Sequence, residues 1–168
     1  MSELPTMSLA KTSRRHLLAL SAATVTLLGL SACGGGGGGN DNTPGWGEVS
    51  GSTAITTLKT TDTLLGAGAE AQNGKKLTVH YTGWLYDVRV TANQKGTQFE
   101  TSTNGSPIAF TLGAGTLIKG WEQGLVGMKV GGKRTLLIPA SLAYGSAGQR
   151  DIPGNAALIF EIQLIGAE

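Results

Sequence analysis

Apolar and polar residues alternate along most of the chain after Ser52, which is the period of strands with one buried face. The clearest run is residues 75–85, where Leu77, Val79 and Tyr81 share one face and polar residues share the other. This run predicts a long half-buried strand. Four shorter candidates follow the same pattern or lie between clusters of turn-forming residues, at residues 133–138, 157–165, 53–59 and 108–112. Together with residues 75–85, they predict a sheet of about five strands.

One segment breaks the two-fold period. Residues 117–126 place apolar side chains at helical spacing, with Thr116 able to cap the start and Gly127 able to end it. Gly120 and Gly124 lie inside this segment and cost roughly 1 kcal/mol each relative to Ala. We therefore expect the helix to depend on packing against the sheet. One short helix on one sheet is an α+β architecture.

The first 32 residues have the order of a secretory signal: a basic start, an apolar run over residues 17–30 and a small-residue site. The segment continues into Leu-Ser-Ala-Cys at residues 30–33, which resembles a bacterial lipobox. We expect cleavage before Cys33 and attachment of lipid to this cysteine. The alternative is that Cys33 is a small buried apolar residue. Residues 13–18, SRRHLL, also resemble a twin-arginine export signal, so the export route stays open.

The stretch after Cys33 predicts a tether. Its run of glycines at residues 34–39 cannot pack a core, which argues against burial of the cysteine, and its composition is typical of flexible linkers. We expect a signal over residues 1–32, the lipidated Cys33 and linker over 33–51, and a folded domain over 52–168. Lipid on Cys33 would hold the domain at the bacterial cell envelope, with the outer membrane or the periplasmic face favoured over the cytoplasm.

Charge and residue inventory argue against several classes of function. The net charge is +2, and because three basic residues and one acidic residue precede Cys33, the remainder carries equal numbers of each. That remainder lacks the basic footprint of a nucleic-acid binder. His80 is the only imidazole after the signal, Cys33 is the only thiol, and no ligand cluster has metal-site spacing. We therefore expect no metal, no cofactor and no hydrolytic triad.

Four stretches carry a resemblance to a known family: VHYTGWL, FTLGAGTLIKGWEQGLVGMKVGGKR, IPASLAYG and ALIFEIQL. Together they resemble an FKBP-type peptidyl-prolyl cis-trans isomerase from Leu77 to Leu164, in its bacterial lipoprotein form. The resemblance implies a five-stranded antiparallel sheet wrapped around one short helix. It also implies an active site in a hydrophobic pocket between the sheet and the helix.

The resemblance assigns roles to particular residues. The Ile118 N–H is implied to bind a substrate carbonyl, and the Tyr144 hydroxyl to reach the bound chain. The implied catalytic positions are Tyr81, Phe99, Glu100, Ile118, Trp121, Tyr144 and Phe160. The implied substrate-binding positions are Ile108, Leu117 and Ile152.

The resemblance also implies a mechanism. Rotation about an Xaa-Pro bond crosses about 18–20 kcal/mol because amide resonance must be broken. A twisted amide is less polar than a planar one, so a dry apolar pocket favours it without acid, base or nucleophile. We expect a monomer that speeds the folding of exported, Pro-containing polypeptides. Two alternatives stay open: a weakly catalytic Pro-peptide-binding module or holdase chaperone, and a surface interaction factor.

Several positions depart from the family pattern or lack a role in it. Glu100 stands where the family usually has Asp, and this extra methylene leaves binding of macrolides of the tacrolimus or rapamycin type open. Residues 86–98 are longer than in compact members and form either a partner surface or filler. We expect Trp46 to be an exposed linker residue, His80 to face outward, and the basic hairpin at residues 129–134 to be solvated.

Overall fold

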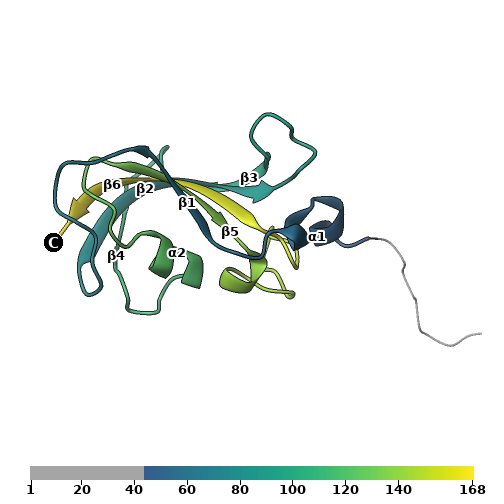
Figure 1. The fold of residues 1–168 in the computed structure, drawn as a ribbon. Coiled ribbons are helices and arrows are strands. Elements are labelled where there is room, and N and C mark those ends of the chain that lie inside the picture. Colours follow the sequence, from purple (N-terminus) through teal and green to yellow (C-terminus); the bar gives the residue numbers. More distant parts are fainter. Residues whose placement is uncertain (1–43) are drawn as a thin grey trace, which may run out of the picture. The chain divides into compact units, whose positions relative to one another are not determined.

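The computed structural model describes residues 44–168, so the predicted signal over residues 1–32, Cys33 and most of the predicted linker lie outside the described part. The described chain forms one antiparallel sheet in the order β1-β5-β6-β2, with β3 and β4 both paired to β2 (Figure 1). The strands are β1 (Lys59–Leu64), β2 (Lys76–Tyr86), β3 (Lys95–Thr101), β4 (Ile108–Thr111), β5 (Lys133–Ile138) and β6 (Leu158–Ala167).

Strands β3 and β4 divide one side of β2 between them. β4 pairs with residues 76–79 and β3 with residues 82–86. The six strands therefore occupy five positions across the sheet. This arrangement confirms the predicted α+β class, with the outermost position split in two.

Most strands lie where the alternation predicts them. β5 has the predicted bounds, while β2, β4 and β6 differ from prediction by one or two residues at their ends. β1 is different, because it begins at Lys59, where the predicted strand 53–59 ends. All six of its side chains are exposed, so no alternation marks it. Part of the predicted strand instead forms the short 3-10 helix η1 (Ser52–Ala54).

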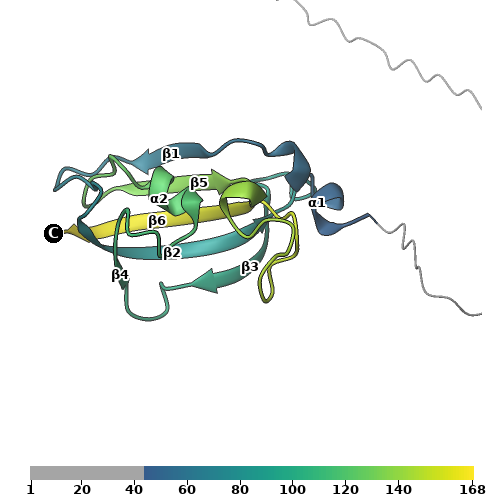
Figure 2. The same ribbon diagram turned by 90° about the horizontal axis from the view of Figure 1, so that it is seen from below.

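The helix over the sheet is shorter than predicted. α2 spans Lys119–Gly124, and Ile118 precedes it as an N-cap residue with extended backbone. Thr116 lies outside the helix and does not cap it. Figures 1 and 2 show α2 on the concave face of the sheet, below β5 and β6. Trp121 and Leu125 from this region pack into the main core together with Leu136 and Ile138 of β5.

The folded part begins before Ser52, which corrects the predicted end of the linker. Residues 46–49 form helix α1 (Trp46–Val49), and Ser50 and Ser52 are buried and hydrogen-bonded to each other at 2.7 Å. Trp46 is half-buried against the main core and is not an exposed linker residue. Within residues 44–168, no helix is long and apolar enough to cross a membrane.

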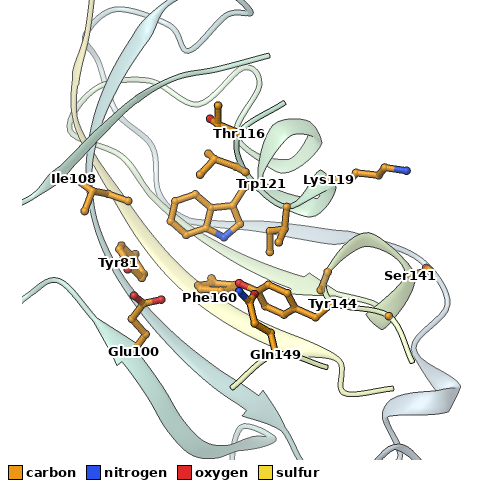
Figure 3. Close-up of a pocket in the computed structure, with 14 residues that line it drawn as sticks. Tyr81, Glu100, Ile108, Thr116, Lys119, Trp121, Ser141, Tyr144, Gln149 and Phe160 are labelled. Atoms are coloured by element: carbon orange, nitrogen blue, oxygen red, sulfur yellow. The ribbon is translucent and has the colours of Figure 1, made fainter. Parts of the chain in front are cut away.

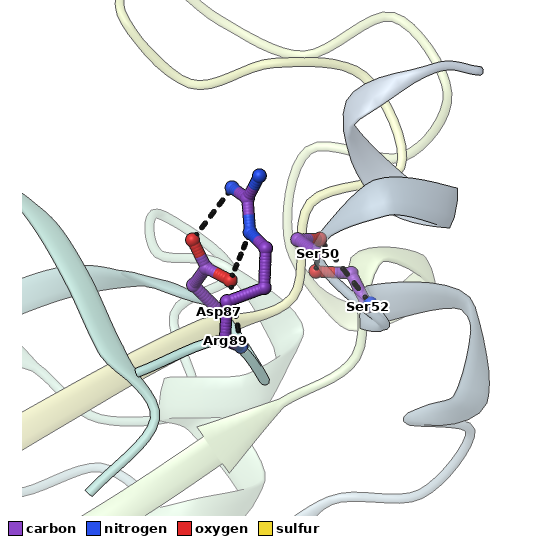
Figure 4. A network of polar contacts seen from close by, with 4 residues as sticks. All are labelled: Ser50, Ser52, Asp87 and Arg89. Atoms are coloured by element: carbon purple, nitrogen blue, oxygen red, sulfur yellow. Dashed lines mark hydrogen bonds and ion pairs between the residues drawn. The ribbon is translucent and has the colours of Figure 1, made fainter. Parts of the chain in front are cut away.

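Residues 86–98 are not one long loop, because β3, which the sequence did not predict, begins within them at Lys95. The Val88 N–H donates to the Ser50 carbonyl at 2.9 Å, and the Arg89 guanidinium lies 5.7 Å from the centre of the Trp46 ring. Arg89 also forms a two-pronged ion pair with Asp87, with Nη2 at 2.7 Å from Oδ2 (Figure 4). The loop therefore packs against α1, which neither the partner-surface nor the filler interpretation predicts.

Candidate active site

A cavity of about 680 Å³ opens between the concave face of the sheet and the segment that leads into α2 (Figure 3). This volume is within the range of ordinary small-molecule and peptide sites. Eight of its fourteen lining residues are apolar or aromatic, and polar side chains, charged side chains and one glycine make up the rest. The lining residues are Tyr81, Glu100, Ile108, Thr116, Leu117, Ile118, Lys119, Trp121, Ser141, Ala143, Tyr144, Gly145, Gln149 and Phe160.

Three aromatic rings from three elements meet at the floor of the cavity. Trp121 of α2 is 4% exposed and meets Tyr81 of β2 edge to face, with 5.1 Å between ring centres. It meets Phe160 of β6 in the same way at 5.2 Å. Edge-to-face pairs are a favourable aromatic geometry, so the three rings fix one another's orientation. Gly83 of β2 leaves room for the Phe160 ring in this cluster, because a Cβ on residue 83 would lie 2.8 Å from that ring.

Polar groups are concentrated on the rim. Figure 3 shows the Glu100 carboxylate directed toward Tyr81, and the side chains of Tyr144 and Gln149 near each other. Burial raises the pKa of Tyr81, and the Glu100 carboxylate beside it raises that pKa further. Burial also raises the pKa of Tyr144, with a smaller contribution from Glu100 in the same direction. Both tyrosines are therefore neutral hydrogen-bond donors at physiological pH. The extra methylene of Glu100 has not taken its carboxylate away from Tyr81.

The backbone before α2 presents a donor to the cavity. The Ile118 carbonyl accepts from the N–H groups of Trp121 at 3.0 Å and Glu122 at 3.3 Å, which begins the helix. No acceptor within residues 44–168 takes the N–H of Ile118 itself. Because Ile118 lines the cavity, this N–H is a candidate donor to a bound carbonyl.

Eight of the ten residues predicted for the pocket line the cavity, and two do not. Phe99 meets Phe160 edge to face, with 5.6 Å between ring centres, but does not itself line the cavity. Ile152 is buried in the core. Both residues instead line a neighbouring depression of about 300 Å³ that shares Glu100, Tyr144 and Gln149 with the cavity.

The structure adds six lining residues that the sequence did not indicate: Thr116, Lys119, Ser141, Ala143, Gly145 and Gln149. Most of them neighbour Leu117, Ile118 or Tyr144 in the chain, which is the signal that could have found them. Gln149 has no such neighbour, because a tight loop over residues 144–157 brings it back to the rim. Its N–H donates to the Ile152 carbonyl at 2.9 Å within that loop.

Two residues predicted to face outward or to be solvated have structural contacts. His80 is half-buried, and its Nδ1 lies 3.2 Å from Ser102 Oγ. Arg134 donates to the carbonyls of Gly124 at 2.8 Å and Val126 at 3.0 Å, at the end of α2, and also pairs with Asp62. Arg134 thus connects β1, β5 and the end of α2. Across the described residues, no cluster of His, Cys, Asp and Glu side chains could hold a metal ion.

Comparison with known proteins identifies the family. The sequence profile of the FKBP-type peptidyl-prolyl cis-trans isomerases matches residues 68–165. The chain belongs to this family. It is therefore an FKBP-type peptidyl-prolyl cis-trans isomerase, as the resemblance implied, and the matched range contains the residues that line the cavity. α1, η1 and β1 lie outside that range.

Individual relatives agree with this assignment. An FK506-binding protein of Neisseria meningitidis serogroup A is 48% identical over 102 residues, which is 60% of this chain and 86% of the relative. FK506-binding protein 2 of Dictyostelium discoideum is 48% identical over 99 residues, or 58% of this chain and 68% of the relative.

Two crystal structures share the FKBP fold. AtFKBP13 has a TM-score of 0.56 at 39% identity, covering 66% of this chain and 93% of that one. FkpA from Escherichia coli has a TM-score of 0.57 at 35% identity, covering 66% of this chain and 48% of that one. The chain therefore spans about half the length of FkpA.

Proposed function

We propose that this FKBP domain accelerates rotation about Xaa-Pro bonds by holding the bond in a dry, aromatic-lined cavity. The observation that carries the proposal is the edge-to-face cluster of Tyr81, Trp121 and Phe160 at the floor of a cavity with an unpaired N–H at its wall. A twisted amide loses resonance and polarity, so an apolar floor stabilises it relative to the planar amide. This is transition-state stabilisation without proton transfer.

Individual residues have distinct tasks in this mechanism. The Trp121 face supports the proline ring, while Tyr81 and Phe160 keep water from the bond. The Ile118 N–H donates to a carbonyl of the substrate, and exclusion of water strengthens that hydrogen bond. The Tyr144 hydroxyl donates to a second acceptor on the bound chain. Its raised pKa keeps this donor protonated across the physiological range.

The first test is protease-coupled isomerisation of Xaa-Pro tetrapeptides by the full chain. Tyr144→Phe removes one donor from the cavity, and a net hydrogen bond of about 0.5–1.5 kcal/mol corresponds to a roughly two- to tenfold loss in kcat/KM. Tyr86→Phe is the matched control, because Tyr86 is buried in a separate cluster with Ala157 and Ile159. A parent no faster than buffer across several Xaa residues would reject the mechanism in favour of a Pro-peptide-binding module or holdase.

We also propose that the substrates are exported, Pro-containing polypeptides and that lipid on Cys33 holds the enzyme at the cell envelope. The support is the order of residues 1–33, with a basic start, an apolar run and the lipobox-like Leu-Ser-Ala-Cys. Metabolic labelling with a clickable fatty acid should mark the parent and not Cys33→Ala. The variant should also leave the membrane fraction. An unlabelled parent in the soluble fraction would contradict the anchor.

A macrolide of the tacrolimus or rapamycin type is a further proposed ligand of the same cavity. The support is the similarity to relatives named FK506-binding proteins, together with the Glu100 carboxylate directed at Tyr81. FK506 should raise the Tm and inhibit turnover. Glu100→Asp should change the affinity, whereas Glu70→Asp, an exposed residue outside the cavity, should not. No shift in Tm at saturating FK506 would reject this ligand.

A further inference from the structure

The segment over residues 44–55, here the N-terminal segment, lies outside the range that the family profile matches. It contains α1 and η1 and ends before β1. It nevertheless reaches the part of the molecule that forms the cavity rim, through the loop over residues 144–157, here the Tyr144 loop. This loop contributes Tyr144, Gly145 and Gln149 to the cavity.

Gly47 is the point of closest approach. A Cβ on Gly47 would lie 2.8 Å from the Cβ of Asn155 and 2.9 Å from its carbonyl oxygen. Real Cβ atoms do not approach so closely, so only glycine allows α1 to lie directly on the Tyr144 loop. Gly47 is buried, and the adjacent Trp46 ring packs against the main core. The contact is therefore part of the folded interior of the protein.

Asn155 transmits this contact to the cavity. Its N–H donates to the Gly145 carbonyl at 2.8 Å, and Gly145 follows Tyr144 in the cavity wall. Asn155 has a φ of +60° and Gly145 a φ of +62°, the left-handed conformation that asparagine and glycine adopt more readily than other residues. A shift of Asn155 therefore reaches Gly145, next to Tyr144, through the hydrogen bond between them.

The opposite side of the N-terminal segment is held as well. Ser50 accepts the Val88 N–H, and a Cβ on Gly51 would lie 3.0 Å from the Val88 side chain. The Ser50 and Ser52 hydroxyls are buried against each other beside the Asp87–Arg89 ion pair (Figure 4). The segment is therefore wedged between two loops, one at the end of β2 and one at the cavity rim.

We propose that the N-terminal segment is a positioning element of the active site, and that the Gly47–Asn155 contact sets the place of Tyr144. The kinetic test of this inference rests on the isomerase mechanism proposed above. It assigns a function to a part of the chain outside the family match. Gly47 and Asn155 are positioning residues, since neither lines the cavity.

The test compares Gly47→Ala with Gly45→Ala in the full chain. A Cβ on Gly45 would have no heavy atom within 4 Å, so this variant controls for the loss of a glycine near α1. Gly47→Ala should raise KM for the tetrapeptide by about two- to fivefold, because displacing the Tyr144 hydroxyl weakens one hydrogen bond without removing it. A loss of folded protein alone would lower apparent kcat in proportion to the folded fraction and leave KM unchanged.

A second variant tests the route through Asn155. Asn155→Gly removes the Cβ that would lie 2.8 Å from a Cβ on residue 47, while the Asn155 carbonyl oxygen at 2.9 Å remains. Glycine accepts the left-handed backbone there without strain. The double variant should therefore recover part of the lost affinity. Unchanged KM in Gly47→Ala would overturn the proposal.

A readout independent of turnover separates this inference from the proposed mechanism. Amide NMR should show shifts at Tyr144 and Gly145 in Gly47→Ala and not in Gly45→Ala. If the parent enzyme is inactive on peptides, the isomerisation mechanism fails, and these amide shifts still decide the positioning role. Unshifted Tyr144 and Gly145 amides would reject the positioning role whatever the activity.

Discussion

Gly120 of α2 lies directly against Ile138 of β5, so close that a Cβ on the glycine would come within 2.8 Å of Ile138 Cδ1. One turn later, Gly124 lies in the same way against Leu136. These glycines lower the intrinsic helix propensity of α2, yet they let its backbone approach the sheet. Close approach brings Trp121, which lies between them in the chain, onto the cavity floor.

Gly120→Ala should therefore destabilise the protein despite the better helix propensity of alanine. Overpacking of a filled core costs about 1–3 kcal/mol. The upper part of this range exceeds the roughly 1 kcal/mol that the helix gains from the better propensity of alanine. Urea unfolding measures the difference. Gly105→Ala, where a Cβ would meet nothing within 4 Å, should stay within about 0.5 kcal/mol of the parent. A stabilised Gly120→Ala would show that the helix can move away from β5 at no cost.

Arg134→Met should lower the free energy of unfolding by about 1–3 kcal/mol, the usual cost of leaving polar groups without their partner. The variant removes donors from the Gly124 and Val126 carbonyls and leaves Asp62 unpaired. Lys133→Met is the matched control, since the Lys133 side chain is exposed and this variant keeps the hydrogen bonds and ion pair of Arg134. Equal stability of the two variants in urea would contradict the connecting role of Arg134.

Stability should fall as the pH rises above about 10. An unfolded tyrosine releases its proton near pH 10, whereas burial and the Glu100 carboxylate keep Tyr81 protonated to higher pH in the folded state. The unfolded state then binds fewer protons than the folded state, so the free energy of unfolding decreases with pH in this range. Tyr81→Phe should flatten that decrease between about pH 10 and 11.5. Identical slopes for parent and variant would show that Tyr81 ionises normally.

Phe99→Leu should lower kcat/KM by less than Phe160→Leu does. Phe160 lines the cavity, whereas Phe99 lines only the neighbouring depression and contacts Phe160 edge to face at 5.6 Å. We expect about threefold for Phe99 and about tenfold or more for Phe160, where tenfold corresponds to about 1.4 kcal/mol. Steady-state kinetics on one Xaa-Pro peptide decides the order. A larger effect at Phe99 would place that ring in contact with substrate.

The alternation of apolar and polar residues in the sequence was sufficient to predict the strands that have one buried face. β5 could be assigned to the residue, and β2 and β6 nearly so, because their buried positions recur every second residue. β1 could not, since all of its side chains are exposed and only hydrogen bonds to β5 define it. Its pairing partner, β5, lies some seventy residues away in the chain, and no pattern within a short stretch of sequence predicts so distant a pairing.

The cavity was predictable where the family motifs cover it and unpredictable where loops return to it. Tyr81, Trp121 and Phe160 each lie in a motif, and the structure brings them together. Gln149 and the Gly47–Asn155 contact depend on how two loops pack, which residue spacing does not encode. The glycine signal at residue 47 could have been noticed, but a sequence rich in glycine offers many equivalent candidates.

The division of the outer position of the sheet between β3 and β4 has a consequence for the proposed action on unfolded chains. A long unpaired strand is a template on which another extended chain can add and begin to aggregate. Here one border of the sheet consists of two short pieces, and the other is β1, which carries Lys59 and Asp62. Interrupted or charged borders discourage such addition. An isomerase with the substrates proposed above can thus engage them at its cavity without becoming a seed for their association.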